Sequence, residues 1–510
     1  MVLVAVTLTC GIAGATTRYV AQSAGTFSSG SACNGKNAIT VATFNATTLS
    51  PGDTTYICGT LTAAAGTSNF IQFGQSGSSS SPITLIFDSG AVIQAPYWSG
   101  PAIEFGGAWI IIDGKGTGIV QATANGTGLA NAQDGGIGLD AGSGCSNCTV
   151  QNLTVSNIYV HSCTGSVSSC TDEGGQNTYG IRAVGGSNLT LTGNTVHDAK
   201  WCNLFAYVSS SGIQISNNTI SNCDHGVVFG DAGAGDTGTG SIFGNDISNM
   251  QNWDDAGDYN HHDGVHTWAN NTGSSYTVQI YNNYLHGNGG HNFNAWLGIE
   301  ANAKNSTLFN NTVNMQSNCV GGVGLVGLFS GGGPYASGVG IYNNTIQGNG
   351  SSDGCEGIGI QEQTGGTLVK NNIVLNTNTF TYIPTSGQVS AIDHNLYYNS
   401  SSGFWCPANV DVAFPTWRSG CTYDANGANS NPNLTSGFLL NSGSPAVGLG
   451  ANLTSLGITA LNSDKSGLAR AATGVCTPGV AGCWDAGSYQ YQSSTTSLPN
   501  PPADLVATVQ

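Results

Sequence analysis

The chain has 510 residues, of which 76 are glycine and only 7% are charged, and its formal net charge is −17. An acidic surface repels nucleic-acid phosphates and anionic lipid, so we expect neither nucleic acid nor a membrane as a partner. General disorder is also excluded, because 39% of the residues are hydrophobic and they are evenly patterned.

Residues 2–15 form an apolar run that ends in Ala13, Gly14 and Ala15. A run of this length with small residues at its end is typical of a secretory signal peptide, so we predict that residues 1–15 direct export. The alternative is a first buried strand. No later stretch approaches the length of a transmembrane helix. We therefore expect a secreted protein, and we expect it to be a monomer.

The cysteines support export, because they fall into close neighbours along the chain. An even set in local pairs is typical of disulfides in an oxidising compartment. The simplest connectivity pairs Cys33 with Cys58, Cys163 with Cys170, Cys202 with Cys223, Cys319 with Cys355, Cys406 with Cys421, and Cys476 with Cys483. Cys145 and Cys148 have CxxC spacing. We interpret them as a loop staple, because neither a helix start nor a second ligand pair is visible.

An internal repeat decides the fold class. An apolar-x-Asn-x-apolar core recurs at intervals that are mostly about one solenoid turn. Its asparagine column runs through Asn152, Asn194, Asn218, Asn245, Asn283, Asn311, Asn344, Asn372 and Asn395. Parallel strands stack about 4.8 Å apart, so identical residues lie on one another and their amides can hydrogen-bond along the column. The sequence therefore predicts an all-β, right-handed parallel β-helix.

Other solenoids do not fit the pattern. The Leu-x-x-Leu-x-Leu frame of a leucine-rich repeat is absent, and helical solenoids need a 3.6-residue periodicity that the chain lacks. A second strand is predicted before most of the column asparagines. In it we expect Arg182, His266 and Trp268 to point outward, and Ile181, Val265 and Thr267 to point inward.

The ends of the chain depart from the repeat, as the caps of a solenoid must. We predict an N-terminal cap and first turns over residues 16–80, the β-helix over 81–400, and a disulfide-stapled closing segment over 401–491. Residues 492–510 are rich in serine and proline at their start. We interpret them as a linker followed by the start of a further module.

Over roughly residues 80–400 the repeat is similar to the pectin-lyase-like β-helix superfamily. The segment from Trp484 to Tyr491 also resembles the closing segment of many secreted bacterial β-helix proteins. Members of the superfamily include polysaccharide lyases, glycoside hydrolases, sugar epimerases and phage tailspikes. The resemblance implies a polysaccharide partner, and it leaves the reaction open.

The densest group of charged and aromatic residues runs from Trp253 to Trp268 and holds four aspartates and three histidines. Stacking by register predicts a groove. Its floor would be Asp198, Lys200, Asp224, His225, His262, Asp263, His266 and His291. Its walls, which would bind sugar rings, would be Trp201, Tyr259, Trp268 and Trp296. Glu300 and Glu362 we interpret as structural residues.

Glycoside hydrolysis needs a carboxylic acid and a second carboxylate. Asp224 and Asp263 precede homologous strands one turn apart, and crowding should raise the pKa of one of them. His225, His262 and His266 would orient the pair or share proton transfer, and no cofactor is required. His262-Asp263-Gly264-Val265 resembles the catalytic element of polygalacturonase-like hydrolases, with Asp263 as the catalytic aspartate. That family's following Asp-Asp pair and Arg-x-Lys are missing.

Two alternatives remain open. Tyr259 to Asp263 faintly resembles an element of alginate epimerases, with His262 at the catalytic histidine. A calcium-dependent lyase or C5-epimerase on uronate polymers would use His262 or Lys200 as the base and hold calcium at Asp224 and Asp263. The absence of Lys and Arg between Lys200 and Lys304 favours a neutral sugar and hydrolysis, or calcium as the cation. The third reading is a non-catalytic glycan-binding solenoid.

Overall fold

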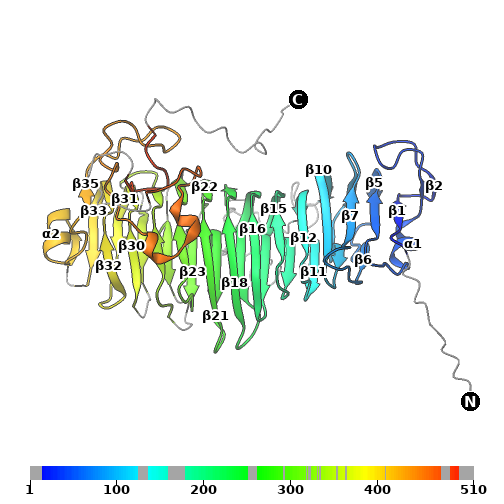
Figure 1. The fold of residues 1–510 in the computed structure, drawn as a ribbon, viewed down its shortest axis with the longest axis horizontal. Coiled ribbons are helices and arrows are strands. Elements are labelled where there is room, and N and C mark those ends of the chain that lie inside the picture. The colour runs from blue at the N-terminus through cyan, green and yellow to red at the C-terminus, as the bar shows by residue number, and fades with distance from the viewer. Residues whose placement is uncertain are drawn as a thin grey trace, which may run out of the picture.

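Parallel strands stack turn upon turn along the long axis of the computed structural model (Figure 1). The structure describes residues 14–124, 136–158, 178–250, 261–290, 293–317, 319, 323–329, 331, 335–351, 354–361, 365–407, 409–471 and 483–492. The predicted all-β parallel β-helix is confirmed over the described turns. The residues predicted as signal peptide lie almost entirely outside this range, as do those of the C-terminal linker.

Each turn contributes strands to three faces, called here the first, second and third face. The first face comprises β1 (Thr17–Val20), β4 (Thr54–Ile57), β7 (Ile83–Phe87), the starts of β10 (Ile110–Ala122) and β12 (Thr149–Ile158), β14 (Thr190–Thr192), β16 (Ser210–Ser216), β18 (Thr237–Phe243), β21 (Ser275–Tyr281), β24 (Thr307–Phe309), β27 (Gly340–Tyr342), β30 (Thr367–Lys370) and β32 (Val389–Asp393).

The second face follows the asparagine column. It comprises β5 (Thr60–Thr62), β8 (Val92–Ala95), the ends of β10 and β12, the starts of β15 (Thr195–Tyr207) and β17 (Thr219–Asp231), β19 (Asp246–Ser248), β22 (Tyr284–Gly287), β25 (Thr312–Met315), β28 (Thr345–Gln347), the starts of β31 (Ile373–Tyr382) and β33 (Leu396–Cys406), and β35 (Ala428–Asn429).

The third face carries the candidate site. It comprises β6 (Ile71–Phe73), β9 (Pro101–Phe105), β11 (Ile137–Ser143), β13 (Tyr179–Val184), the ends of β15 and β17, β20 (His262–Ala269), β23 (Phe293–Ala301), β26 (Val326–Phe329), β29 (Glu356–Ile360) and the ends of β31 and β33. The long strands β15 and β17 run from the second face round a corner onto the third.

The inward side chains of the three faces form one continuous apolar core. The predicted alternation is confirmed on the third face, where Ile181, Val265 and Thr267 are fully buried. Trp268 and Arg182 point outward and are half-buried, whereas His266, also predicted to point outward, is buried. One turn cannot bury its own apolar face, so the core exists only because the turns stack.

The asparagine ladder is confirmed from Asn194 to Asn395. At each step the amide oxygen accepts the backbone N–H and the side-chain amide of the column residue one turn earlier, at 2.8–3.1 Å. The side-chain amide also donates to a backbone carbonyl of the preceding turn, as Asn311 does to Ile280. Asp424 ends the column by accepting both bonds from Asn395.

The placement of Asn152 in this column was wrong by one residue. The register pairs Thr154 with Thr195, so Leu153 occupies the column position and donates its backbone N–H to Asn194. Asn152 instead occupies the position before the column, where the chain needs a positive φ. That position is filled by Gly193, Asn217, Gly244, Asn282, Asn310, Asn343, Asn371 and His394, with φ of 50° to 66°. Glycine and asparagine tolerate this region best, which explains the recurrent Asn-Asn pair.

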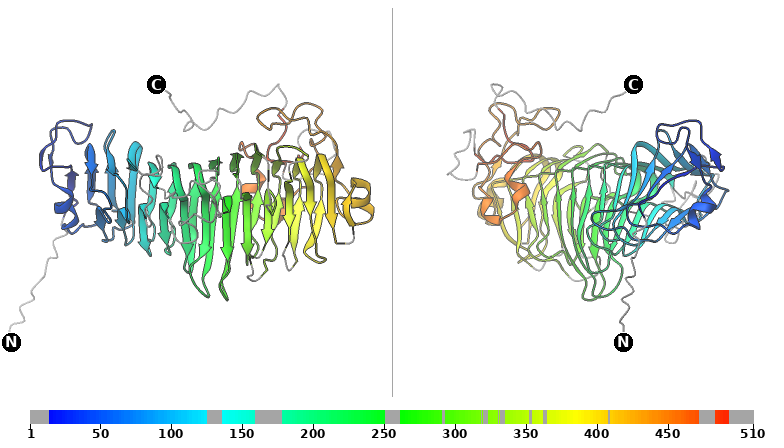
Figure 2. Two further views of the ribbon diagram at one scale, coloured as in Figure 1. Left: turned by 180° about the vertical axis from the view of Figure 1, so that it is seen from behind. Right: turned by 45° about the vertical axis from the view of Figure 1, so that its right-hand side comes forward.

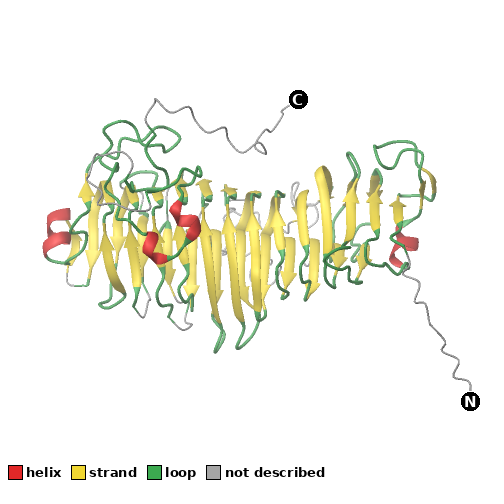
Figure 3. Ribbon diagram, viewed as in Figure 1, coloured by secondary structure: helices red, strands yellow, loops and turns green. Residues whose placement is uncertain are grey.

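Helices are short and lie towards the ends of the chain (Figure 3). In the N-terminal cap, α1 (Val41–Asn45) accompanies the antiparallel pair β2 (Gly25–Thr26) and β3 (Asn37–Ala38). At the other end α2 (Phe414–Ser419) follows β34 (Asn409–Val412). None of the described helices has the length and apolar character needed to cross a membrane.

The chain then folds back along the solenoid, through the short 3-10 helices η2 (Thr454–Leu456) and η3 (Thr459–Asn462) (Figure 2). Its contacts are specific hydrogen bonds to the positive-φ column. Asn310 donates to the carbonyl of Ser463 and accepts from Arg470, while Asn371 accepts the backbone N–H of Ala451. The segment therefore covers the outside of the middle and late turns.

Disulfides join Cys33 to Cys58, Cys202 to Cys223, Cys319 to Cys355 and Cys406 to Cys421, as predicted. Cys145 and Cys148 form the predicted loop staple. Cys163, Cys170 and Cys476 lie outside the described residues. Cys483 forms no disulfide with another described residue, and its pairing with Cys476 stays a prediction.

The ladder predicts a large effect for Asn311→Ala. The change leaves the buried N–H of Asn283 and the carbonyl of Ile280 without their partner, and each such group costs about 1–3 kcal/mol. We expect urea denaturation to show a free energy of unfolding lower by about 3 kcal/mol. Asn314→Ala, on the half-buried outer side of the same turn, is the control and should cost less than about 1 kcal/mol. If both variants lose the same free energy of unfolding, the ladder does not contribute the stability proposed here.

Asp88 supplies a second prediction, in the N-terminal cap. Burial raises the pKa of Asp88, but hydrogen bonds from Ser31, Ala32 and Cys33 outweigh burial and lower the pKa to about 2. This carboxylate therefore stabilises the cap above pH 3.8, its ordinary value, and the contribution is lost as the pH falls towards 2. Calorimetry should show wild type melting above Asp88→Asn at pH 6, with the difference shrinking below pH 4.

Candidate functional site

Three imidazoles and one carboxylate converge at the start of the third face. His225 comes from β17 and Asp263 and His266 come from β20, whereas His261 directly precedes β20. The parallel register places His225 directly beside Asp263. One nitrogen of each histidine and one oxygen of Asp263 all lie within 4.8 Å of one another. These four residues are called the His–Asp cluster below.

Asp263 Oδ2 is the centre of the cluster. It lies 3.3 Å from His225 Nε2, 3.2 Å from His261 Nε2 and 3.5 Å from His266 Nδ1. His225 Nε2 and His266 Nδ1 are themselves 3.2 Å apart. Asn294 donates its side-chain amide to Asp263 Oδ1 at 3.2 Å. Asp263 is fully buried, whereas the His261 side chain is 52% exposed.

Two further carboxylates contact the far nitrogens of two of these rings. Glu300 Oε2 lies 2.8 Å from His266 Nε2, and Asn270 donates to Glu300 Oε1 at 2.7 Å. Asp224 Oδ1 lies 3.1 Å from His225 Nδ1. The cluster is thus held between two outer carboxylates, and Glu300 remains 13% exposed.

The predicted stacking of Asp224 on Asp263 was wrong. The register pairs Trp201 with His225 and His225 with Asp263, so Asp224 lies one residue before the column that holds Asp263. Successive residues of a strand point to opposite sides, so the two aspartates do not face each other. Lys200, Asp224 and His262 are all buried at the corner between the second and third faces.

His262 therefore lies inside the corner rather than in a groove. Its Nδ1 faces the backbone carbonyls of Met250 and Gly289. Asp198 is also absent from the cluster, because its carboxylate contacts the adjacent His197 at 2.6 Å. Tyr259 and His291 lie outside the described residues, so their predicted roles stay predictions.

The cluster shifts the pKa values of its own members. Burial raises the pKa of Asp263, but the imidazoles of His266 and His225 outweigh it and lower that pKa to about 2. Burial lowers the pKa of His225, but Asp224 and Asp263 together raise it to about 10. The pKa of His261 is lowered, chiefly by burial.

The expected carboxylic acid with a raised pKa is not found at this site. The pKa of Asp224 is lowered because the charge of His225 outweighs burial. The pKa of Glu300 is lowered because its hydrogen bond with His266 does the same. From the sequence, two adjacent carboxylates were expected to repel each other and so to raise the pKa of one of them. In the structure imidazoles lie between the carboxylates and stabilise their charged forms, which lowers their pKa values instead.

Two of the predicted aromatic walls flank the cluster. Trp201 and Trp268 point outward, half-buried, with ring centres 5.7 Å from His225 and 5.1 Å from His266 respectively. Trp296 was predicted as a wall and is not one. It is fully buried, contacts Phe293 and donates its indole N–H to the Met315 sulfur. A register shift between β20 and β23 turns its side chain into the core.

The donor set does not fit calcium. Calcium takes six to eight oxygen ligands. Around Asp263 Oδ2 the nearest groups are three imidazole nitrogens, and Asp224 faces away from Asp263. The described residues of the cluster therefore do not supply the predicted calcium pair.

Two residues of the site escaped the sequence analysis. His261 was given no role of its own within the stretch from Tyr259 to Asp263, and Glu300 was interpreted as structural. The inward–outward alternation of the strands could have indicated Glu300. Trp268 was expected to point outward, and Glu300 is its register partner on the next turn. His261 lies just before β20, outside the strand, and no alternation rule reaches it.

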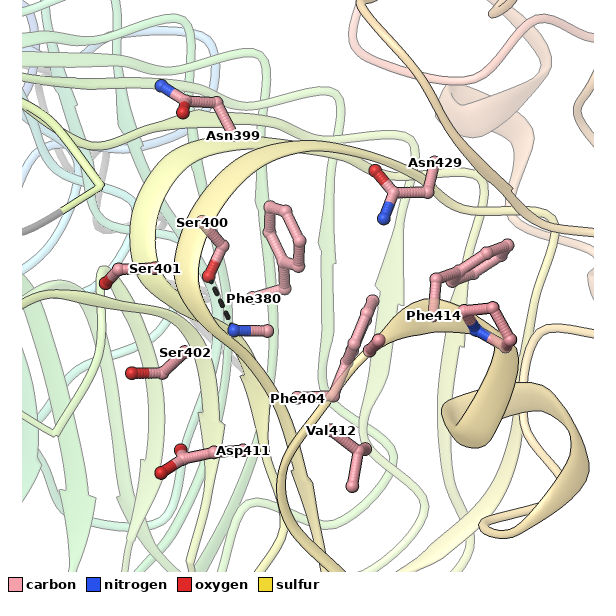
Figure 4. A pocket seen from close by; sticks show the side chains of 13 residues that line it. Phe380, Asn399, Ser400, Ser401, Ser402, Phe404, Asp411, Val412, Phe414 and Asn429 are labelled. Atoms are coloured by element: carbon pink, nitrogen blue, oxygen red, sulfur yellow. Dashed lines mark hydrogen bonds between the residues drawn. The ribbon is translucent and has the colours of Figure 1, made fainter.

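A separate cavity lies far along the solenoid, among β33, β34 and α2 (Figure 4). Phe380, Phe404 and Phe414 line one side of it, and Ser400, Ser401 and Ser402 line the other. It brings together no group of titratable side chains comparable to the His–Asp cluster among its described residues.

No protein-family model matches the sequence, and no curated protein matches it either. Solved structures do match in fold. The pectate lyase Pel9A is 15% identical with a TM-score of 0.50, and the match covers 94% of this chain and 98% of that protein. The PL6 family alginate lyase AlyGC is 13% identical with a TM-score of 0.45, covering 77% and 52%. The A-module of the Azotobacter vinelandii mannuronan C-5 epimerase AlgE4 is 13% identical with a TM-score of 0.30, covering 74% and 89%. The likeness to the pectate lyase shows the fold.

The two tryptophans of this region should respond differently to truncation. Trp296→Ala opens a cavity in the core and should lower the free energy of unfolding by about 3–5 kcal/mol. Trp268→Ala removes a half-buried surface ring, and we expect a loss of about 1 kcal/mol. Urea denaturation of both variants measures the difference. A large loss at Trp268 with none at Trp296 would contradict their placement.

Proposed function

We propose that this protein is a secreted enzyme that cleaves a polysaccharide at the His–Asp cluster on its third face. One observation carries the proposal. A half-exposed His261 and a partly exposed Glu300 flank the buried Asp263, beside the outward rings of Trp201 and Trp268. Flat aromatic rings bind sugar rings, and the exposed groups can exchange protons with them. The disulfides support an oxidising, extracellular location.

Hydrolysis is the reaction that the charges favour. Lys200 is buried, and Arg182 is held by Asp140 at 2.5 Å, so neither presents a free cation to a uronate. The carboxylates of Asp224, Asp263 and Glu300 would repel a polyuronate further. A neutral polymer meets no such repulsion. Water would add to the anomeric carbon as the glycosidic C–O bond breaks, and the leaving oxygen would gain a proton.

The two reachable groups would carry the proton transfers, with Glu300 and His261 on either side of the bond that breaks. Glu300, whose lowered pKa keeps it a carboxylate, would accept the proton of the attacking water. His261 would give a proton to the leaving oxygen and regain one from the protonated His225 through Asp263. Asp263 would act indirectly, through His261, because its carboxylate contacts His261 Nε2 at 3.2 Å and does not reach solvent. His266 would couple the two sides, since its two nitrogens contact Asp263 and Glu300.

Elimination at a uronate is the second candidate. The pectate lyase likeness extends over nearly the whole chain, which is compatible with that chemistry without choosing it. A uronate substrate would need a cation at the cluster to offset the surrounding carboxylates. The two reactions differ in their products, because only elimination leaves an unsaturated sugar that absorbs ultraviolet light.

The test is a panel of neutral and uronic polysaccharides, assayed for new reducing ends and for ultraviolet absorbance. We expect reducing ends without absorbance on a neutral polymer. Glu300→Gln and Asp263→Asn should each lower the rate about 10²–10⁴-fold, the usual contribution of a proton-transfer group.

Glu104→Gln is the matched control. Glu104 lies on the same face in β9, paired with Gln72, several turns from the cluster, and the change should leave the rate unaltered. New ultraviolet absorbance on a uronic polymer would contradict hydrolysis and identify the reaction as elimination. Polysaccharide binding without any new ends would leave a glycan-binding solenoid as the function.

A further inference from the structure

We propose that His225, His261, His266 and Asp263 form a binding site for one divalent transition-metal ion of the zinc type. The site shares its side chains with the proposed function, but the inference rests on donor geometry and not on any substrate. Zinc is bound by nitrogen and carboxylate donors in tetrahedral sites, and three histidines with one carboxylate meet that requirement.

Four of the six distances between the donor atoms match the edges of a tetrahedron around such an ion. Zinc–nitrogen bonds of about 2.0–2.1 Å give tetrahedral edges of about 3.3–3.4 Å between ligand atoms. The distances from Asp263 Oδ2 to the three nitrogens are 3.2, 3.3 and 3.5 Å, and His225 Nε2 lies 3.2 Å from His266 Nδ1. All four donors lie within 4.8 Å of one another.

An outer carboxylate orients one of the rings for metal binding. Metal-bound histidines usually donate their other N–H to a carboxylate, which fixes the tautomer. Glu300 accepts from His266 Nε2 at 2.8 Å, so Nδ1 of that ring turns its lone pair towards the cluster. Asp224 Oδ1 lies 3.1 Å from His225 Nδ1 and supplies a charge beside that ring without a hydrogen bond.

A buried acceptor points independently to a ligand. Asp263 Oδ2 is fully buried and meets no N–H in hydrogen-bonding geometry among the described residues. It lies 3.3 Å from His225 Nε2, 3.2 Å from His261 Nε2 and 3.5 Å from His266 Nδ1. A buried carboxylate oxygen without a hydrogen-bond donor is unfavourable. A metal ion that displaces the protons of these rings would satisfy the carboxylate and the ring nitrogens together.

The backbone preforms this arrangement. His225 and Asp263 are direct register partners on adjacent turns, and His266 follows Asp263 on the same strand. The disulfide between Cys202 and Cys223 joins β15 to β17 close to His225. A preformed site with nitrogen donors disfavours calcium and magnesium, which prefer oxygen ligands.

The test is direct metal binding by the full chain without any polysaccharide. Protein stripped with a chelator is titrated with Zn²⁺ alone by calorimetry, and with Co²⁺ for the visible absorption of tetrahedral cobalt. We expect one ion per chain for both metals, and no saturable binding of Ca²⁺ at the same concentrations.

Asp263→Asn and His225→Gln should weaken Zn²⁺ binding at least 100-fold, and Glu300→Gln about 10–100-fold through His266. His286→Gln is the matched control. It removes another histidine in contact with an aspartate, Asp246 at 2.9 Å, away from the cluster, and should leave the affinity unchanged. If a buried variant fails to fold, as circular dichroism would show, the half-exposed His261→Ala takes its place, with the same expected loss.

Each outcome separates the two proposals. No saturable Zn²⁺ binding, or binding that survives both His225→Gln and His261→Ala, overturns the metal site and leaves the proposed cleavage standing if the stripped protein still cuts polysaccharide. Tight Zn²⁺ binding lost in the cluster variants supports the metal site. Should neither the zinc-loaded nor the stripped protein then release ends from any polymer, the metal site stands and the proposed cleavage falls.

Discussion

The register between successive turns is the constraint on which the rest of the structure depends. The ladder from Asn194 to Asn395 fixes it, because each amide binds both the backbone and the side chain of its neighbour in the column. A slip of one residue would break these bonds and turn the apolar side chains out of the core. The same register decides which polar residues meet on the outer surface, about 4.8 Å apart.

The cluster follows from that register and from one feature of the corner before it. Gly226 and Gly264 lie where the chain turns onto the third face, and a Cβ on either would lie 2.6 Å from the carbonyl of the next turn. Without side chains at this corner, His225 and Asp263 can stand side by side on the outer surface. Asp224 and His262, one residue earlier, are buried inside the corner as a consequence.

Charged residues are scarce in this chain, so the ionisable groups of the cluster interact mainly with one another. Three imidazoles and three carboxylates gather in a partly dry region, where each group is stabilised chiefly by its neighbours. Such an assembly can hold protons, a metal ion, or each in turn. A polysaccharide bound across Trp201 and Trp268 would meet it through His261 and Glu300, the members that reach solvent.

The sequence by itself determined the parallel β-helix, four of the disulfides and the loop staple, and the region of the site. Periodic apolar residues, stacked asparagines and neighbouring cysteines are local patterns that a chain carries into any correct fold. It did not determine that Asp224 faces away from Asp263, that Trp296 is buried, or that Glu300 joins His266. Those facts depend on which residue of one strand pairs with which residue of the strand on the next turn. The loops between strands vary in length, so the sequence alone does not give this pairing. Only the tertiary structure decided it, because the hydrogen bonds that fix the pairing join residues more than twenty positions apart.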